Sequence, residues 1–251
     1  MTLREFFAEN SKCALAFSGG ADSAYLLYAA KDCGADVTAY FVKTPFQPEF
    51  EFGDAVRLAK ELGAKLRIVE CDPLADAAVR SNGPDRCYHC KRRIFSAIAE
   101  SAAADGRGLI IDGTNASDDA SDRPGMRALR ELGVRSPLRE CGITKPELRR
   151  LSAEAGLFTA EKPAYACLAT RIPTGEAIEP ETLRRVECAE EALMELGLSD
   201  FRVRVRRGAG LIQVTEGQMP FVLENRLEVI GRVRPFFDEI YLDLDARKAS
   251  L

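Results

Sequence analysis

The sequence predicts an α/β protein, with a doubly wound parallel sheet followed by a small C-terminal α+β domain. Short apolar runs alternate with segments of helical periodicity over the first two thirds of the chain, as in βαβα proteins. An irregular stretch with three prolines then covers residues 157–180. A helix, two strands, a helix and a strand are predicted after it. We therefore place the two domains at residues 1–174 and 175–251.

The elements of the first domain follow from the spacing of its apolar residues. Strands are predicted at 13–17, 36–42, 65–70 and 108–112, with a further short strand at 135–138. Helices are predicted from Ser23 to Asp32, over 50–62 and from Lys91 to Ala104. Parallel sheets of this kind bind ligands at the carboxyl ends of their strands. We therefore expect the functional groups in the loops that follow the strands.

The second domain has a different order of elements. Its predicted elements are a helix at 181–197, strands at 201–206 and 210–215, a helix at 219–231 and a strand at 239–243. The first of these helices carries an apolar stripe formed by Leu183, Val186, Ala189, Leu193 and Leu196. This order predicts an antiparallel sheet with helices on one side.

Composition limits the class of partner. The chain has 251 residues, with 35 Lys and Arg against 39 Asp and Glu, and a pI near 5.4. Proteins that bind long nucleic acids usually carry a basic excess, so we expect no nucleic-acid partner. The sequence shows no apolar stretch of membrane-spanning length and no signal-peptide pattern. We therefore expect a soluble, cytoplasmic protein with no membrane partner.

The segment Ser18-Gly19-Gly20-Ala21-Asp22-Ser23 joins the first predicted strand to the first helix. A glycine turn at a helix N-terminus brings backbone N–H groups and hydroxyls together where an anion would bind. The segment lacks the lysine of the G-x-x-x-x-G-K-[ST] loop. Asp22 would either cap the helix or help to hold Mg²⁺. An ordinary Gly-Gly turn is the alternative for the whole segment.

A second polar cluster follows the fourth predicted strand and should face the same crevice. Gly113 and Asn115 belong to it, and Arg123 comes shortly after and could meet a phosphate. Its carboxylates suggest Mg²⁺ binding, although Asp118, Asp119 and Asp122 would also suit a solvated acidic loop. Lys43, just past the second strand, is a weaker phosphate candidate.

The chain contains eight cysteines, which fall into two groups. Cys87 and Cys90 form a C-x-x-C just before the predicted helix at Lys91, and Cys167 lies in the irregular stretch. A lone C-x-x-C is either half of a zinc site, completed by His89 or another cysteine, or a redox dithiol. Three unrelated thiols are a further alternative. The other five cysteines sit in apolar patterns and behave as small hydrophobic residues: Cys13, Cys33, Cys71, Cys141 and Cys188.

Four stretches carry a resemblance to known proteins. The SGGADS loop resembles that of the PP-loop ATP pyrophosphatases, which implies cleavage of ATP to AMP and pyrophosphate with activation of an acid as its adenylate. Together with DRCYHCKRRIF, the DGTN to RPGMRALRELGVRSPLRE segment and KPAYACLATRIPTGEAI, the loop resembles the LarE family of ATP-dependent sulfur transferases. These stretches span most of residues 12–187. The resemblance implies a PP-loop fold and ATP with Mg²⁺ as cofactors.

The family resemblance also implies a substrate. LarE enzymes adenylylate a carboxylate of pyridinium-3,5-biscarboxylic acid mononucleotide and convert it to a thiocarboxylate. This reaction belongs to the biosynthesis of the nickel-pincer nucleotide, the cofactor of lactate racemase. A small mononucleotide, a sulfide source and further copies of the chain in a hexamer are the partners that the resemblance implies.

Cys167 is the sulfur-handling position by this resemblance, and two mechanisms are open. In the first, Cys167 attacks the acyl-adenylate and C–S cleavage leaves dehydroalanine on the chain. In the second, three cysteines hold a four-iron, four-sulfur cluster whose fourth iron carries a hydrosulfide. Because Cys87 and Cys90 accompany Cys167, we favour the cluster.

Arginines are expected to bind the substrate. In the strand from Phe201 to Arg206 alternation places Arg202 and Arg204 on one face, and guanidinium groups bind carboxylates and phosphates bidentately. Arg171, close to Cys167, and Glu187, on the preceding helix, are further candidates. The alternative for each arginine is the exposed face of a half-buried strand.

Three other functions compete with sulfur transfer to a small acid. A PP-loop tRNA thiolation enzyme could also use C-x-x-C with a third cysteine, but the acidic pI disfavours it. An amide ligase of the same superfamily would give the cysteines no role. A non-catalytic ATP-binding regulator would bind ATP without substrate-dependent release of pyrophosphate.

Overall fold

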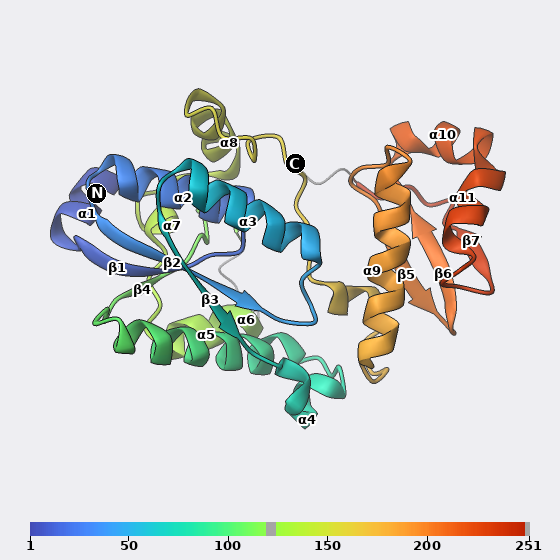
Figure 1. Ribbon diagram of the computed structural model, residues 1–251, viewed down its shortest axis with the longest axis horizontal. Helices are drawn as coiled ribbons and strands as arrows, with labels where there is room; N and C mark the ends of the chain where they lie inside the picture. The colour runs from blue at the N-terminus through green and yellow to red at the C-terminus, as the bar shows by residue number, and fades with distance from the viewer. Residues whose placement is uncertain (119–123, 249–251) are drawn as a thin grey trace. The chain divides into compact units, whose positions relative to one another are not determined.

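The computed structural model describes residues 1–118 and 124–248. The chain folds into two compact units, shown in Figure 1. The first unit comprises Met1–Val79 and Asp85–Lys162, and the second comprises Arg80–Pro84 and Pro163–Leu251. A short piece of the first half of the chain thus belongs to the second unit. The domain boundary expected at 174/175 stays a prediction.

The first unit is built on a parallel sheet of four strands in the order β3-β2-β1-β4. The central strand β1 pairs with both neighbours, so that Leu15 lies opposite Ala39 on one side and Ile111 on the other. The predicted α/β class with a parallel sheet is confirmed. The strands are β1 (Lys12–Ala16), β2 (Asp36–Lys43), β3 (Lys65–Glu70) and β4 (Ile110–Ile111).

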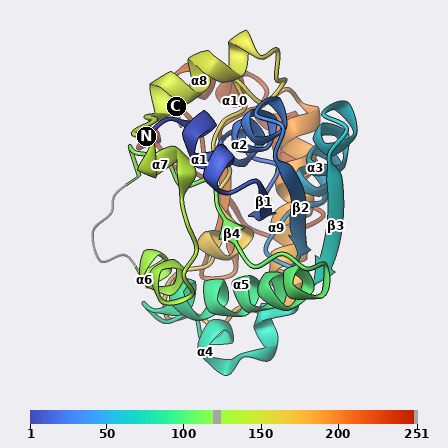
Figure 2. The same cartoon turned by 90° about the vertical axis from the view of Figure 1, so that its left-hand side faces the viewer.

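Helices cover both faces of this sheet, because neighbouring residues of a strand point to opposite sides. Phe41 of β2 packs in an apolar core with Phe6 and Leu26, whereas Tyr40 beside it packs with Phe95. Figures 1 and 2 show α2 and α3 on one face and α5 and α6 on the other. The helices are α1 (Leu3–Glu9), α2 (Ala21–Asp32), α3 (Glu49–Glu61), η1 (Pro73–Ala75), α4 (Ala77–Arg80), α5 (Arg86–Ala104), α6 (Pro124–Glu131), α7 (Pro137–Glu140) and α8 (Lys145–Glu154).

The second unit contains a sheet of three strands in the order β5-β6-β7. β5 and β6 are antiparallel, but β6 and β7 are parallel, because two helices intervene between them. The predicted all-antiparallel sheet is therefore wrong in its last pair. The elements are η2 (Leu168–Arg171), α9 (Pro180–Glu195), β5 (Arg202–Arg206), β6 (Ala209–Gln213), η3 (Glu216–Gln218), α10 (Met219–Glu224), α11 (Arg226–Val233) and β7 (Ile240–Leu242).

Three local predictions differ from the structure. α5 begins at Arg86 rather than Lys91, so the C-x-x-C lies inside the first turns of the helix and not before it. The strand expected at 135–138 is reduced to one bridge between Arg135 and Ile111, because Pro137 starts a helix there. The single helix expected at 219–231 is broken at Asn225. Within the described ranges, no helix has the length and apolar character needed to cross a membrane.

Candidate active site

The loop between β1 and α2 has the geometry of an anion site. Ser18 N–H donates to Ser23 Oγ (3.3 Å), and the two serine Oγ atoms are 3.1 Å apart. Ser23 Oγ donates to the carbonyl of Gly20, which is the N-cap of α2 (3.2 Å). The N–H groups of Ala21 and Asp22 in the first turn have no acceptor within the described residues. These donors, at the positive end of the helix dipole, suit a phosphate.

Two glycines allow this loop to pack closely. Gly19 has a φ of +73°, and a Cβ there would lie 3.0 Å from the Glu51 carbonyl of α3. A Cβ on Gly113, which follows β4, would lie 2.8 Å from the backbone N of Ser23. The loop after β4 therefore lies directly against the first turn of α2, as the strand-end argument predicted, and only glycine fits at Gly113.

Asp22 does not cap its helix. Its Oδ2 is 2.6 Å from Lys145 Nζ, and its Oδ1 accepts a hydrogen bond from Asn115 Nδ2 at 3.0 Å. Asn115 is 2% exposed and lies behind Asp22, so in this structure it orients the carboxylate. Lys145, which sequence reasoning did not single out, is the ionic partner of Asp22.

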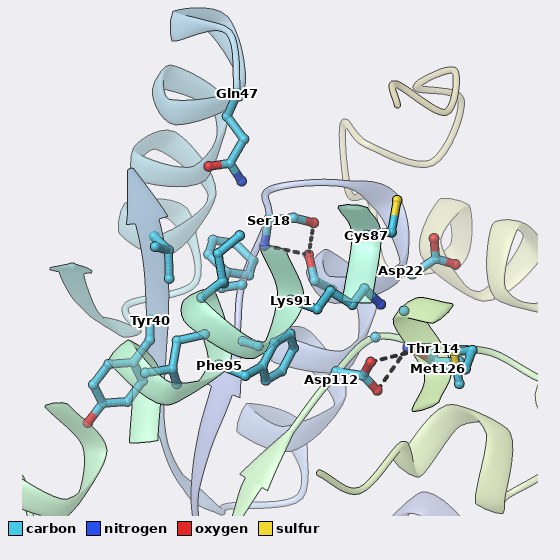
Figure 3. A pocket seen from close by; sticks show the side chains of 18 of the residues that line it. Ser18, Asp22, Tyr40, Gln47, Cys87, Lys91, Phe95, Asp112, Thr114 and Met126 are labelled. Carbon is cyan, nitrogen blue, oxygen red and sulfur yellow. Dashed lines mark hydrogen bonds between the residues drawn. The ribbon is translucent and has the colours of Figure 1, made fainter. Parts of the chain in front are cut away.

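A cavity of about 570 Å³ opens at the carboxyl ends of β1, β2 and β4. Its apolar wall includes Tyr40, Val42 and Phe95. Figure 3 shows Ser18, Asp22, Lys91 and Cys87 around the same space. The polar residues that line it are Ser18, Asp22, Ser23, Gln47, Cys87, Lys91, Asp112, Thr114 and Asp118.

Two groups in the cavity wall lack partners. Lys91 has no hydrogen-bond or ion-pair partner in residues 1–118 and 124–248, and its stem lies against Gly125, where a Cβ would be 3.2 Å from Lys91 Cδ. Gln47 Oε1 is buried and likewise accepts no hydrogen bond. Lys91 is partly buried, whereas Gln47 Oε1 is fully buried. Buried polar groups without partners are uncommon, and both groups line the cavity, where a ligand could supply the missing partner. Neither residue was predicted from the sequence as a ligand contact. Lys91 could have been predicted, because it follows Cys87 by four positions on a helix and therefore lies on the same face as that cysteine.

The acidic residues that line the cavity already accept hydrogen bonds from other residues of the chain. Asp112 is 6% exposed and accepts hydrogen bonds from Ser136 Oγ and Thr114 Oγ1, both at 2.6 Å. Asp118 Oδ2 accepts one from Asn115 N–H. Within residues 1–118 and 124–248 no three His, Cys, Asp or Glu side chains gather as a metal site. Mg²⁺ commonly takes one or two carboxylates and completes its shell with phosphates and water, so these acids still suit a metal that enters with ATP.

One predicted nucleotide contact, Lys43, does not line the cavity, and another falls outside the described residues. The ammonium of Lys43 lies 3.3 Å from Glu49 and over the ring of Phe52. Arg123 and the acidic residues Asp119 and Asp122 lie outside the described residues.

Cys87 and Cys90 lie one turn apart on α5, on the same side of the helix. Cys87 is exposed and lines the cavity, and Arg86 Nη2 donates to its Sγ at 3.4 Å. An iron–sulfur cluster is held by thiolates, and this helix turn presents two of them. The first unit therefore offers two of the three thiols that the expected cluster requires, while Cys167 belongs to the second unit.

Within the second unit, Cys167 precedes η2 and is partly buried. The arginines expected to bind substrate contact the backbone of its segment. Arg171 Nη1 donates to the Cys167 carbonyl at 3.3 Å, and Arg202, only 6% exposed, donates to the Ala164 carbonyl at 2.6 Å. Their roles as substrate contacts stay predictions.

Arg204 differs from these two arginines because it is exposed. Its Nη1 donates to the Thr170 carbonyl at 2.5 Å and its Nε to Gln213. On α9, the partly buried Glu187 lies one turn before Glu190, and it is Glu190 that meets Arg171. A glutamate on the apolar stripe of this helix was the signal that sequence reasoning overlooked.

Known proteins resemble this chain over most of its length. It is 33% identical over 87% of its residues to pyridinium-3,5-bisthiocarboxylic acid mononucleotide synthase of Lactiplantibacillus plantarum, 80% of which is covered. It is 35% identical over 97% of its residues to an uncharacterised protein of Synechocystis, 91% of which is covered. The tRNA-specific 2-thiouridylase MnmA of a Thermotoga species is 27% identical over 60% of this chain and 54% of its own length. No known protein-family profile matches the chain.

Proposed function

Because this chain belongs to the LarE family of PP-loop ATP-dependent sulfur transferases and is therefore a sulfurtransferase, we propose that it thiolates a carboxylate of pyridinium-3,5-biscarboxylic acid mononucleotide. The L. plantarum relative is named for the bisthiocarboxylic acid mononucleotide, the product of that conversion. The reaction would serve nickel-pincer nucleotide synthesis and lactate racemase maturation, and would take place in the cytoplasm.

The observation that carries the proposal is the cavity shared by the SGGADS loop and Cys87. The phosphates of ATP would bind the free N–H groups of α2 and Lys91, because both supply positive charge without an internal partner. The adenine would lie against Tyr40, Val42 and Phe95, where Gln47 Oε1 could accept from its amino group. Gly19 and Gly20 would let the phosphates approach the backbone.

The activation step uses groups that surround this cavity. A substrate carboxylate oxygen attacks the α-phosphorus of ATP, the bond to the β-phosphate oxygen breaks, and pyrophosphate leaves with its negative charge. Lys91 and the N-terminus of α2 would stabilise that charge. Mg²⁺ would enter with the nucleotide and meet Asp22, Asp112 or Asp118. The product is an acyl-adenylate.

The sulfur step is assigned to Cys167. In the sacrificial route its thiolate attacks the acyl carbon and AMP leaves with the former carboxylate oxygen. A base then removes the Cα proton of Cys167 and the Cβ–S bond breaks, so that thiocarboxylate leaves and dehydroalanine stays on the chain. In the route we favour, Cys87, Cys90 and Cys167 hold a four-iron, four-sulfur cluster, which would supply sulfide without consuming a cysteine.

The covalent chain supports a joint role for the three cysteines. Asn82, in the second unit, donates from Nδ2 to the Pro173 carbonyl at 2.9 Å, and the chain runs from it directly into Cys87. Lys162, in the first unit, has its ammonium 2.7 Å from Asp54 and 3.5 Å from the Gly19 carbonyl, and the chain runs from it directly into the Cys167 segment. Both cysteine segments thus begin where the chain passes between the units.

A tRNA thiolation enzyme is the second candidate, favoured by the similarity to MnmA. The near balance of charge counts against it, because RNA binding relies on basic surfaces. We propose instead a small mononucleotide, an external sulfide source and a homo-oligomer, a hexamer as in the family resemblance, as the partners.

The proposal is tested by mixing the protein with ATP, Mg²⁺ and the biscarboxylate mononucleotide, and measuring pyrophosphate and thiocarboxylate. Release of pyrophosphate that depends on the carboxylate is expected. Thiolation of tRNA, sensitive to salt, with no reaction of the mononucleotide would favour the second candidate. ATP binding without turnover would indicate a non-catalytic ATP-binding regulator.

The route of sulfur is tested separately under strict anaerobiosis. The purified protein should be brown and contain about four irons per chain if the cluster forms. Cys87→Ser should then abolish sulfur transfer. Colourless, iron-free protein that thiolates its substrate and loses the mass of H₂S at Cys167 would establish the sacrificial route, in which Cys87→Ser is nearly harmless.

A further inference from the structure

The segment that carries Cys167 has no strand and only one short 3₁₀ turn to hold it. Guanidinium groups hold several of its backbone carbonyls. Arg171 Nη1 donates to the carbonyl of Ala166 at 2.6 Å and to that of Cys167 at 3.3 Å, and the Cys167 carbonyl also accepts from the Thr170 N–H at 3.0 Å and the Thr170 hydroxyl at 2.8 Å. Arg202 Nη2 donates to the Ala164 carbonyl at 2.6 Å. Charged donors therefore fix the backbone immediately before the sulfur-handling residue.

Arg171 is itself fixed by Glu190 from α9. Its Nε lies 2.9 Å from Glu190 Oε1 and its Nη2 lies 3.0 Å from Oε2, a bidentate pair. The side chains are 0% and 1% exposed. Burial by itself would lower the pKa of Arg171, but the contact with Glu190 outweighs it and the pKa lies above its ordinary value. The pair is thus a bidentate ion pair that is out of reach of solvent.

The remaining hydrogen-bonding positions of the Glu190 carboxylate are also occupied by groups of the second unit. Glu190 Oε1 also accepts from the Val203 N–H at 2.8 Å, and Oε2 accepts from the Tyr165 hydroxyl. Burial, with the charge of Glu190, raises the pKa of Tyr165, so the phenol keeps the proton that it donates. A carboxylate with four donors and no exposed surface has no capacity left for a substrate.

We infer that Glu190 is a positioning residue that acts through Arg171 to hold the backbone of Cys167 where its sulfur meets the activated carboxylate. The inference rests on the proposed function, since it assigns the sulfur step to Cys167. It also assigns Arg171 a different role from the substrate contact that the sequence suggested. Arg204, which is exposed, stays the better candidate for that contact.

Glu190→Gln isolates this role. The amide keeps the volume of the side chain but carries no charge, and its NH₂ group faces a guanidinium that also donates. Arg171 would lose its bidentate partner inside the protein, so the carbonyl of Ala166 would lose its fixed donor and that of Cys167 would keep only its bonds from Thr170. A displacement of the thiol by about 1 Å is sufficient to slow a transfer step roughly 100-fold.

The decisive readout is the number of pyrophosphates released per thiocarboxylate formed. The wild type should release one for each. In Glu190→Gln, activation in the first unit continues, but thiocarboxylate formation should fall roughly 100-fold, so water hydrolyses the acyl-adenylate and the ratio rises. A purely structural role would lower both products in proportion to the folded fraction. Glu191→Gln, the same change at an exposed position of α9, is the matched control and should keep the wild-type ratio.

A second variant and a second measurement keep the test decisive. Arg171→Lys keeps the charge pair with Glu190, but one ammonium cannot hold both carboxylate oxygens and two carbonyls, so it should also raise the ratio. Hydrogen exchange of residues 164–172 in the unliganded protein should speed up in both variants but not in Glu191→Gln. This readout does not need turnover, so it survives a failure of the proposed function.

Two outcomes would overturn the inference. The first is a folded Glu190→Gln protein with the wild-type ratio and wild-type exchange over residues 164–172. The second is that neither Glu190→Gln nor Arg171→Lys folds, as judged by circular dichroism, which would assign the pair to stability alone.

Discussion

The cavity beside the SGGADS loop and the Cys167 segment (residues 164–172) are both surrounded by charged side chains, but these side chains differ in whether they have partners within the chain. In the cavity, Lys91 and Gln47 Oε1 have no partner within the described residues, and the first N–H groups of α2 have no acceptor there. In the Cys167 segment, Arg171 and Glu190 are saturated by neighbours. Unused donors and acceptors indicate where a ligand binds, whereas saturated ones indicate where the chain fixes its own position.

Under the proposed function, this difference would separate activation in the cavity from sulfur delivery by Cys167. The cavity should respond to ligands and to the removal of its free donors. The Cys167 segment should respond to changes in its internal partners, even where these contact no substrate.

The largest effect is expected for Cys167→Ala. Sulfur transfer should be abolished, because the proposed sulfur carrier is gone, while pyrophosphate release that depends on the carboxylate should continue. Parallel assays of pyrophosphate and thiocarboxylate measure both halves. Cys188→Ala, the same change in a cysteine outside the proposed site, should leave both unchanged. Loss of pyrophosphate release in Cys167→Ala would show that the two halves are not separable.

Lys91→Met removes a cation that has no partner among residues 1–118 and 124–248, and it approximately keeps the length of the side chain. A hydrogen bond to a charged group contributes about 1.5–3 kcal/mol, so pyrophosphate release should slow roughly 10- to 100-fold. The yield of thiocarboxylate per pyrophosphate should stay at the wild-type value. Lys60→Met, at an exposed position of α3, serves as the control. An unchanged rate in Lys91→Met would remove this lysine from the phosphate site.

Gly113→Ala tests the contact between the loop after β4 and the N-terminus of α2. Its Cβ would lie 2.8 Å from Ser23 N, so the backbone must shift, at a cost of about 1–3 kcal/mol in the free energy of unfolding. Chemical denaturation measures that loss, and calorimetry should show weaker ATP binding. Gly108→Ala meets nothing within 4 Å and is the control. Equal stability of the two variants would contradict the close approach.

The smallest effect concerns the ion pair between Arg107, which precedes β4, and Asp36 at the amino end of β2. A hydrogen bond from Arg107 holds the pKa of the Asp36 carboxyl below its ordinary value of 3.8. Because the folded pKa is the lower one, this stabilisation is present above the unfolded pKa and is lost as the pH falls below about 4. The half-exposed carboxylate makes the effect modest. In Asp36→Asn the free energy of unfolding should depend less steeply on pH in this range.

The fold and the position of the loop between β1 and α2 were predictable because they depend on local patterns. Apolar runs between helical segments predicted the parallel strands, and two glycines between a strand and a helix predicted the loop around Ser18 and Ser23. The pairing of β6 with β7 was not predictable from alternation, because a strand's direction depends on how the helices between the strands cross the sheet.

The contacts of Arg171, Glu190 and Arg202 could not be predicted from the periodicity of the sequence. Alternation placed Arg202 and Arg204 on one face of a strand, yet Arg202 is buried because it reaches the ring of Tyr165 and the Ala164 carbonyl. Glu190 lies on an apolar helix stripe, and its partner Arg171 comes from a segment without regular pattern. Such contacts join residues far apart in sequence, and no spacing rule encodes them.

The most direct test of two-step thiolation follows oxygen from the substrate. The protein is given ATP and mononucleotide with ¹⁸O in its carboxylates, and AMP and pyrophosphate are analysed by mass spectrometry. If the carboxylate attacks the α-phosphorus and sulfur then displaces AMP, each AMP carries one ¹⁸O atom and pyrophosphate carries none. Unlabelled AMP, or ADP and phosphate in place of AMP and pyrophosphate, would contradict activation of the carboxylate as its adenylate.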